Sequence, residues 1–372
     1  MPAFTGQLRP NEIFASLFNM IISQETFADN IDDVKSTLVD MARVDGSLYG
    51  DTKLYYSTDV LKSAPWGNDA EATNLLQLHR PKAPEVQAIL LNVFRQISLT
   101  VDDYLSKRAW GTEYAFSQFN GVMIGWIRET KRVYDATLYN SYIGTAESTI
   151  GRQQISITLP TQTGDAEATA RLQGSAIAEA IANLMVDIKD VTRDFNDYGH
   201  LRSFPVSSLL FVWNSEQVNK INKVDLPTIY HKEGLVDKLG EHTLPARYFG
   251  KVNTTTGTVA ANNTTIRSLI EGDYVIGEDT DPIHVFPGDL LPAGATYAAN
   301  TTYTVDPTII CKIYHRRSVP YMSAFEVGTS FFNAKSLTEN RYLTFGHNTL
   351  EYLKNYPFIT VRGTTPPPSG DK

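Results

Sequence analysis

Residues able to do acid–base, nucleophilic or metal chemistry are scattered along this sequence. Its histidines stand at positions 79, 200, 231, 242, 284, 315 and 347, so no two are three or four residues apart, the spacing that puts two imidazoles on one helical face. The GxxxxGK(S/T), GxGxxG, GxSxG and HExxH motifs are absent. The sequence therefore predicts no catalytic residue, no cofactor-binding residue and no metal ligand.

Two acidic groupings are the remaining candidates for a cation site. Asp102 adjoins Asp103, and the segment GEDTDP holds Glu278, Asp279 and Asp281. A calcium loop of the EF-hand type also needs a glycine and a final glutamate at set offsets, and neither follows here. A solvated acidic turn is therefore favoured over a metal site.

Composition limits the class of protein. The chain has 372 residues, 42% of them hydrophobic, enough to bury a sizeable core. Lys and Arg number 33 against 41 Asp and Glu, a net charge of −8, which argues against a protein whose main task is wrapping phosphate backbones. Cys311 is the only cysteine, so an intrachain disulfide is excluded and a buried, inert thiol is expected. No segment reads as a secretion signal or reaches the roughly 18 apolar residues of a membrane span, and no membrane partner is predicted.

Basic residues gather in four short clusters. These are HRPK at 79–82, Lys107 with Arg108, RETKR at 128–132 and YHRR at 314–317. They lack the regularly interleaved aromatics of a single-strand nucleic-acid binder. Pairing with acidic patches on a neighbouring subunit is therefore the favoured interpretation.

Apolar periodicity predicts four helices. An amphipathic helix follows Pro10 and Asn11, and a long one runs from about Thr112 to Ile143, with Gly144 as its C′ residue. One face of the long helix is apolar, and the other, expected to be free, carries Arg128, Glu129, Lys131, Arg132 and Asp135. A third helix is expected from Asp165 to Asp197, and a fourth from Ser215 to Gly234.

Strand formers dominate the other segments. Residues 51–76 read as an extended, hairpin-like excursion with its tip near Ala64 to Ala72, and residues 86–105 as its returning strand. VSSLLFVWN at 206–214 reads as a buried strand and residues 251–306 as a small β insertion. Long closing strands are predicted at 309–315, 321–333, 341–352 and 358–363.

This order of elements resembles the tailed-phage major capsid proteins of the Hong Kong 97-type fold, most closely the compact versions of small short-tailed phages. The resemblance covers nearly the whole chain and runs through YGDTKLYYSTDVLKSAPW, FNGVMIGWIRETKRVYDATLYNSYIG and SSLLFVWNSEQVNKI. It implies an α+β fold. Its expected parts are an N-terminal arm at 1–44, an extended loop at 45–95, a peripheral domain with a spine helix at 96–144 and 307–363, an apical domain at 145–306 with the β insertion at 251–306, and a flexible tail at 364–372.

The same resemblance implies a structural role without catalysis. The chain is expected to self-assemble through hexamers and pentamers into an icosahedral phage head around double-stranded DNA, which it contacts non-specifically. Scaffolding, portal and decoration proteins are the expected partners. The expected location is the virion, with assembly in the host cytoplasm.

The extended loop and the arm are the expected contacts between subunits. A two-stranded hairpin is marginal in water, so the loop cannot bury its own apolar residues and is expected to reach over a neighbour. The arm presents an apolar helical face that suits a strap across an adjacent subunit. The predicted interface residues are Phe14, Leu17, Phe18, Tyr55, Tyr56, Trp66, Arg80, Lys82, Arg128 and Arg132.

Three alternatives remain at this point. One is an encapsulin-like nanocompartment with the same fold that is loaded with a cargo enzyme. Another is a phage surface protein that binds glycan receptors, suggested by the Tyr and Trp content and the β insertion. The least favoured is an unrecognised enzyme with a site near Glu278 and His284.

Overall fold

The computed structural model describes most of the chain after residue 36. The described residues are 37–46, 52–63, 78, 80–102, 113–162, 164–222, 241–260, 266–268, 272–274, 283–285 and 289–364. The predicted arm helix, the tip of the extended hairpin and nearly all of the tail lie outside these residues. The acidic group at 278–281 also lies outside them, as does Asp103.

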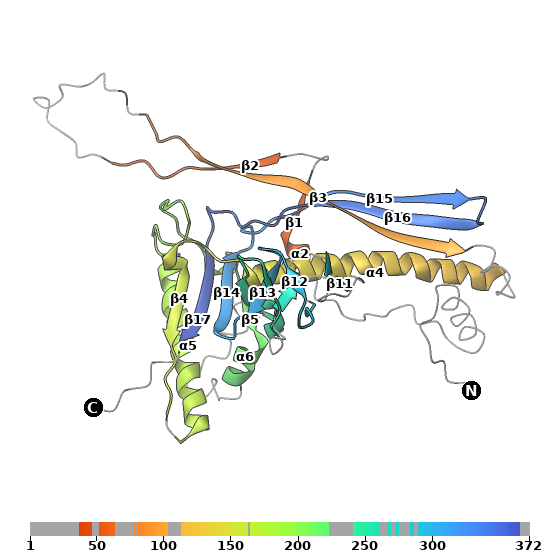
Figure 1. Ribbon diagram of the computed structural model, residues 1–372. Helices are drawn as coiled ribbons and strands as arrows, with labels where there is room; N and C mark the ends of the chain where they lie inside the picture. The colour runs from red at the N-terminus through yellow and green to blue at the C-terminus, as the bar shows by residue number, and fades with distance from the viewer. Residues whose placement is uncertain are drawn as a thin grey trace, which may run out of the picture.

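One sheet is built from long strands that run beside a long helix, α4 (Figure 1). Its order is β1-β15-β16-β3-β2, with β1 parallel to β15 and the other pairs antiparallel. The strands are β1 (Arg43–Asp45), β15 (Tyr321–Asn333), β16 (Thr338–Asn348), β3 (Glu85–Asp102) and β2 (Thr52–Ser57). The predicted returning strand and the predicted closing strand at 321–333 are thereby confirmed, and the closing strand predicted at 341–352 is present but runs from Thr338 to Asn348.

The long helix α4 (Glu113–Thr145) is confirmed, but its predicted end is wrong. Gly144 lies inside the last turn and does not terminate the helix. A Cβ atom there would lie 2.0 Å from the carbonyl oxygen of Tyr248. Gly144 is therefore required by the close approach of another backbone, not by a left-handed conformation. The short helix α2 (Thr37–Ala42) packs against the same end of α4, where Leu38 and Val39 share a core with Ile143.

A second sheet forms the other half of the molecule, with order β4-β17-β14-β5-β6. Its strands are β4 (Gln154–Thr158), β17 (Phe358–Thr364), β14 (Ile309–His315), β5 (Leu209–Asn214) and β6 (Glu241–Leu244). Successive side chains of β5 point to opposite faces of the sheet and enter two different cores. Phe211 packs with helix α5, and Val212 packs with the end of α4. The sheet is thus buried on both faces, which explains the continuous apolar run in β5.

Helix α5 (Ala166–Lys189) begins where expected and ends earlier than predicted. The side chain of Asp165 caps it by accepting a hydrogen bond from the amide of Ala168. The predicted extension to Asp197 is wrong, because the chain turns after Lys189 into a loop in which Thr192 and Arg202 exchange two backbone hydrogen bonds of 2.9 Å. Helix α6 (Ser215–Asn222) starts at the predicted residue, and its predicted end at Gly234 lies outside the described residues.

The described parts of the segment 251–306 contain short strands, as the sequence predicted, and its status as an insertion stays a prediction. It contains the short strands β7 (Gly250–Val252), β8 (Gly257–Thr258), β9 (Ile266–Ser268), β10 (Gly272–Tyr274), β11 (Ile283–Val285), β12 (Thr296–Tyr297) and β13 (Thr302–Val305). Val259, Leu291 and Ala295 form a small core of their own.

Strand pairing crosses the predicted boundary at residue 307. Strands β14 and β17 belong to the closing segment, yet they pair with β5 and β4 of the segment 145–306. Strands β15 and β16 of the same segment pair with β3 beside the spine helix. The division into arm, loop, peripheral and apical domains stays a prediction.

Candidate assembly surface

Strands β2 and β3 form an antiparallel hairpin that projects beyond the rest of the molecule (Figure 1). Residues directly opposite each other in such a pair point to the same face. One face therefore holds three opposed pairs, which we call the outer face: Thr52 with Leu90, Leu54 with Ala88 and Tyr56 with Val86. Its large side chains are exposed: Leu54 by 49%, Tyr56 by 64%, Val86 by 50% and Leu90 by 52%.

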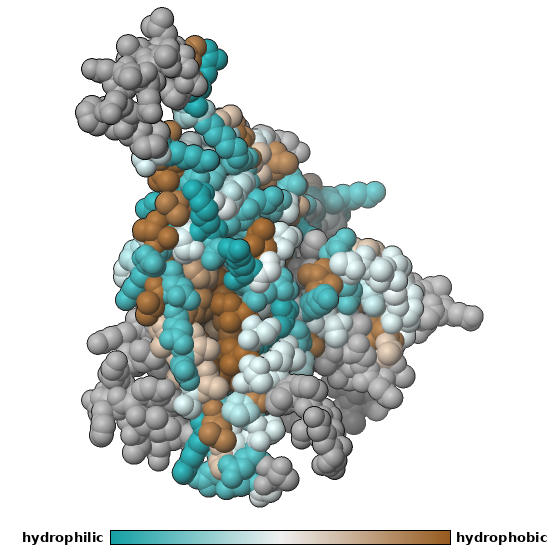
Figure 2. All heavy atoms as spheres, turned by 90° about the vertical axis from the view of Figure 1, so that its left-hand side faces the viewer, coloured by the Kyte–Doolittle hydropathy of each residue, from teal (hydrophilic) through white to brown (hydrophobic). Residues whose placement is uncertain are grey.

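The inner face of the hairpin is satisfied within the chain. Ile89 and Leu91 are buried in a core with Met322 and Leu353. The Gln87 side chain donates to the carbonyl oxygen of Tyr352 at 3.0 Å and accepts from the amide of Lys354 at 2.9 Å. The two faces thus differ in kind, since only the outer face keeps a row of apolar side chains in water. Figure 2, which views the molecule from the left-hand side of Figure 1, shows apolar residues at the surface among polar ones.

A second exposed apolar group lies at the free end of the β15–β16 hairpin. Phe331 and Phe332 are adjacent, so they point to opposite faces, and both are more than half exposed. The rings of Phe331 and Tyr342 contact each other across the hairpin, with their centroids 6.2 Å apart. Aromatic rings exposed at the tip of a long, rigid hairpin are typical of a contact surface.

The polar side of the spine helix is only partly free. Asp135 is 1% exposed and accepts hydrogen bonds from Lys131 at 3.0 Å and Tyr321 at 2.6 Å. Arg43 completes this group from β1 at 3.3 Å. The expectation that Asp135 lies on a free face is therefore wrong. The carboxylate is buried because three donors from three elements compensate for its loss of water.

The structure separates the predicted interface residues. Tyr56 lies on the outer face, whereas Tyr55 points inward and packs near Ile89. Arg80, Arg128 and Arg132 are exposed, and Lys82 pairs with Glu85 of its own hairpin at 2.9 Å. Phe14, Leu17, Phe18 and Trp66 lie outside the described residues.

Sequence reasoning missed Val86, Leu90, Phe331 and Phe332. The run VQAILL is apolar at nearly every position, so its period does not tell which residues face outward. The pair Phe331–Phe332 stands directly before the turn residues Asn333 to Ser336, a pattern that does signal aromatics at a hairpin tip.

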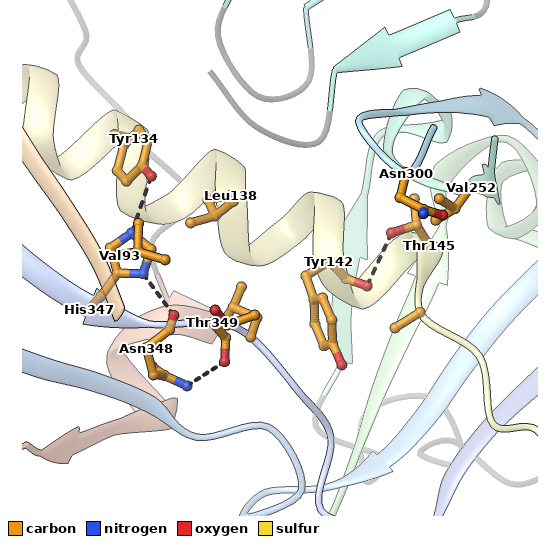
Figure 3. Close-up of a pocket in the computed structure, with 12 residues that line it drawn as sticks. Val93, Tyr134, Leu138, Tyr142, Thr145, Val252, Asn300, His347, Asn348 and Thr349 are labelled. Carbon is orange, nitrogen blue, oxygen red and sulfur yellow. Dashed lines mark hydrogen bonds between the residues drawn. The ribbon is translucent and has the colours of Figure 1, made fainter. Parts of the chain in front are cut away.

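A cleft of about 310 Å³ lies between α4, β16 and the β insertion (Figure 3). Tyr134, Leu138 and Tyr142 project into it from successive turns of α4. His347 contacts the carbonyl oxygen of Asn348 through Nδ1 at 2.9 Å, and its Nε2 lies 3.1 Å from the Tyr134 hydroxyl. Because a carbonyl only accepts, Nδ1 carries the proton and Nε2 accepts from Tyr134. Burial lowers the pKa of His347, so the ring stays neutral and the cleft offers apolar surface more than acid–base chemistry.

Ser57 and His200 form a serine–histidine contact, with Ser57 Oγ 2.8 Å from His200 Nδ1. Ser57 donates its proton to the Asn355 side-chain oxygen at 2.6 Å. His200 Nδ1 must then be the donor to Ser57, and a protonated Nδ1 cannot act as a base toward that hydroxyl. The pair is a structural hydrogen-bond network.

The other reactive groups give a similar picture. Cys311 is fully buried in β14, and burial raises the pKa of its thiol well above the usual range, as expected for an inert cysteine. Within the described ranges, no three His, Cys, Asp or Glu side chains come together as metal ligands would. In the same ranges, the helices are too short or too polar to cross a bilayer.

Comparison with known proteins identifies the fold. No protein-family model and no curated protein sequence matches the chain. Among solved structures, a chain of the "Capsid structure of Staphylococcus phage Andhra" aligns with 92% of this chain and 87% of its own length, at a TM-score of 0.59 and 8% identity. A chain from the structure of the "head fiber and inner core protein gp22 of native bacteriophage P68" aligns with 91% of this chain and 87% of its own length, at a TM-score of 0.60 and 9% identity. The chain has the α+β fold that the sequence led us to expect, that of Hong Kong 97-type phage capsid proteins.

Proposed function

We propose that this chain is the major capsid protein of a tailed phage, a structural subunit that self-assembles into an icosahedral head around double-stranded DNA. The likeness to the Staphylococcus phage Andhra capsid structure, over 92% of this chain and 87% of that chain, supports this assignment. The subunit then resides in the virion after assembly in the host cytoplasm. Its role is architectural, which fits the inert state of Cys311 and Ser57.

The observation that carries the proposal is the outer face of the β2–β3 hairpin. It leaves Leu54, Tyr56, Val86 and Leu90 about half exposed on a projecting element. Covering the remainder of each side chain stabilises a contact by roughly 1 kcal/mol per residue. Such a gain is small in one subunit. In a shell every subunit repeats it, so the sum over a closed assembly is large.

The arrangement suits the hexamers and pentamers of an icosahedral shell. The outer face of β2–β3 and the tip of β15–β16 lie at different places on one sheet (Figure 1), because β3 pairs with β2 through residues 85–90 and with β16 through residues 91–102. A subunit with two such contacts can bind neighbours within one ring and in the next ring. Scaffolding, portal and decoration proteins and non-specifically bound DNA are proposed as further partners because the chain resembles the major capsid proteins of tailed phages.

Two alternatives are less favoured. An encapsulin-like compartment has the same fold, and the presence of packaged DNA in native particles separates the two assignments. A glycan-binding surface protein does not need the exposed apolar hairpin face, and it predicts a small oligomer that binds sugars.

The test is assembly of the purified chain, followed by sedimentation and negative-stain electron microscopy. The wild-type protein should form closed particles or hexagonal and pentagonal rings. Tyr56→Glu places a charge on the outer face and should keep the chain as small species with unchanged thermal unfolding. Leu172→Glu, at an exposed position on α5, is the matched control and should assemble normally.

Two results would contradict the proposal. One is a wild-type chain that stays a uniform small oligomer at every concentration tested. The other is a Tyr56→Glu variant that forms particles with the yield of the wild type.

A further inference from the structure

The hairpin is tied to the body by a polar cluster at the point where β2 ends. The cluster, which we call the hairpin clasp, joins the hairpin residues Ser57, Thr58 and Asp59 to a loop at 192–202 and to Asn355. It matters because the apolar inner core stops near this point. Val60 and Leu61, which follow directly, are 52% and 78% exposed. Polar contacts therefore hold this part of the hairpin, since apolar contacts do not.

Asp59 is the centre of the clasp. Its Oδ1 accepts from the amide of Leu201 at 2.9 Å, and its Oδ2 accepts from Arg193 Nη1 at 2.6 Å. Arg193 Nη1 also donates to the carbonyl oxygen of Gly199 at 2.7 Å. The amide of Leu201 and the Arg193 guanidinium hold the pKa of Asp59 far below its usual range, so the carboxylate is charged at any ordinary pH.

Arg202 closes the other side. Its Nη2 donates to the carbonyl oxygen of Thr58 at 2.6 Å, and its Nε donates to the Asn355 side-chain oxygen at 3.3 Å. The same Asn355 oxygen accepts from Ser57, which is 5% exposed. Three consecutive hairpin residues are thus held by two arginines, one backbone amide, one asparagine and His200, whose Nδ1 lies 2.8 Å from Ser57 Oγ.

The loop that receives the hairpin contains hydrogen bonds that do not involve the hairpin. Thr192 and Arg202 pair through two backbone hydrogen bonds of 2.9 Å, and Asn196 bonds His200 through both its side-chain oxygen and its nitrogen. Gly199 supplies the positive φ of 64° that the turn needs. The hydrogen bonds that shape this loop therefore do not depend on Asp59, and they place its donors, the Leu201 amide and Arg193, around the carboxylate.

We infer that the hairpin clasp sets the direction of the β2–β3 hairpin, which makes Asp59, Arg193 and Arg202 positioning residues for assembly. This rests on the proposed function, in which the outer face meets a second copy of the chain. A hairpin that swings freely would lose its conformational entropy when it docks, and that loss would be repeated at each contact of the shell. The clasp orders the hairpin within the subunit, so less conformational entropy is lost when the hairpin docks. The clasp also fixes the angle between the outer face and the rest of the subunit. Because a neighbour docks on that face, the same angle sets how two subunits are tilted and so limits the curvature of the assembly.

The first experiment is hydrogen exchange of the full-length, unassembled chain, measured for wild type, Asp59→Ala and Glu85→Gln. Glu85→Gln is the matched control, because it removes an ion pair in the same hairpin, with Lys82, and none of the hydrogen bonds that join Ser57, Thr58 and Asp59 to the loop. The Glu85 charge acts on His200 of the loop only through space. Asp59→Ala should speed exchange of the Leu201 amide and of residues 52–57 at least about tenfold, as loss of charge-assisted hydrogen bonds predicts. Glu85→Gln should leave both unchanged.

The second experiment is assembly of the same variants. Asp59→Ala should form fewer particles of more varied diameter, and Glu85→Gln should match the wild type. Unchanged exchange in Asp59→Ala overturns the inference, and so does normal assembly of Asp59→Ala despite faster exchange. If the wild type itself forms no particles, the proposed function fails, and the exchange comparison still decides whether the clasp holds the hairpin.

Discussion

Lys312 is expected to make the stability of the subunit depend on pH over an unusual range. It lies in the centre of the second sheet, is 0% exposed and donates to the carbonyl oxygen of Ala146 at 2.9 Å and to Thr360 Oγ1 at 2.8 Å. The nearest carboxylate oxygen, of Glu147, is 3.7 Å away. Burial lowers the pKa of Lys312 from 10.5 to about 7, and Glu147 offsets only part of this effect.

The sign of the effect follows from proton binding. Between about pH 7 and pH 10.5 the unfolded chain holds the lysine proton more tightly than the folded chain does, so folding stability rises with pH. Below about pH 7 Lys312 stays protonated in both the folded and the unfolded chain, so folding carries the full free-energy cost of burying its charge. At about 1.4 kcal/mol per pKa unit, the cost is about 5 kcal/mol at about pH 6 and falls to about 1.5 kcal/mol at about pH 9.5. The expected gain over this range is about 3 kcal/mol.

Urea unfolding of wild type and Lys312→Met at these two pH values measures the gain. Methionine also removes the donors to Ala146 and Thr360, but that loss contributes equally at both pH values and cancels in the comparison. The wild type should gain about 3 kcal/mol relative to Lys312→Met as pH rises. Lys251→Met, at an exposed lysine on β7, controls for the loss of one positive charge. A difference that stays constant within about 1 kcal/mol would refute the reasoning.

Three further predictions concern the spine helix and the core. Gly144→Ala forces a Cβ against the Tyr248 carbonyl and should destabilise the chain by about 3 kcal/mol, whereas Gly125→Ala on the same helix meets open space and should stabilise it by about 0.5 kcal/mol. Thermal unfolding of both variants checks this, and equal effects would contradict it. Asp135→Ala removes the buried acceptor that Lys131, Tyr321 and Arg43 share, while Glu326 still lies 3.4 Å from Lys131 Nζ, and it should cost about 3 kcal/mol in urea unfolding; a cost below about 1 kcal/mol would count against the network. Cys311, whose thiol pKa is raised by burial, should react with a disulfide reagent at about pH 8 only after unfolding, and prompt reaction of the native chain would show that its environment is misjudged.

The element order could be predicted because its signals are local. The spine helix shows a 3.6-residue apolar period through Tyr134 and Leu138, and the closing strands are rich in β-branched and aromatic residues. These patterns fix the type of each element within a few residues. The errors fell at helix ends, where Gly144 and the segment after Lys189 follow contacts with distant backbone.

The candidate surface was only half predictable. The sequence indicated that the extended hairpin carries more apolar residues than it can bury, among them Leu54 and Tyr56. It could not assign Tyr55 to the inner face or Val86 to the outer face. That choice is set by strand register, and register depends on which face meets Met322 and Leu353, residues far along the chain.

What the sequence determined by itself was the fold class, the order of helices and strands and the absence of a recognised catalytic motif, because periodicity and motifs are properties of neighbouring residues. Only the tertiary structure decided which charges are buried. Asp135 and Lys312 look like surface residues in the sequence, yet both are buried once partners from other elements surround them. Asp59 is not buried, but it too finds its hydrogen-bond partners on a loop more than a hundred residues away. Burial and pairing of charge depend on long-range packing, and local sequence carries no record of it.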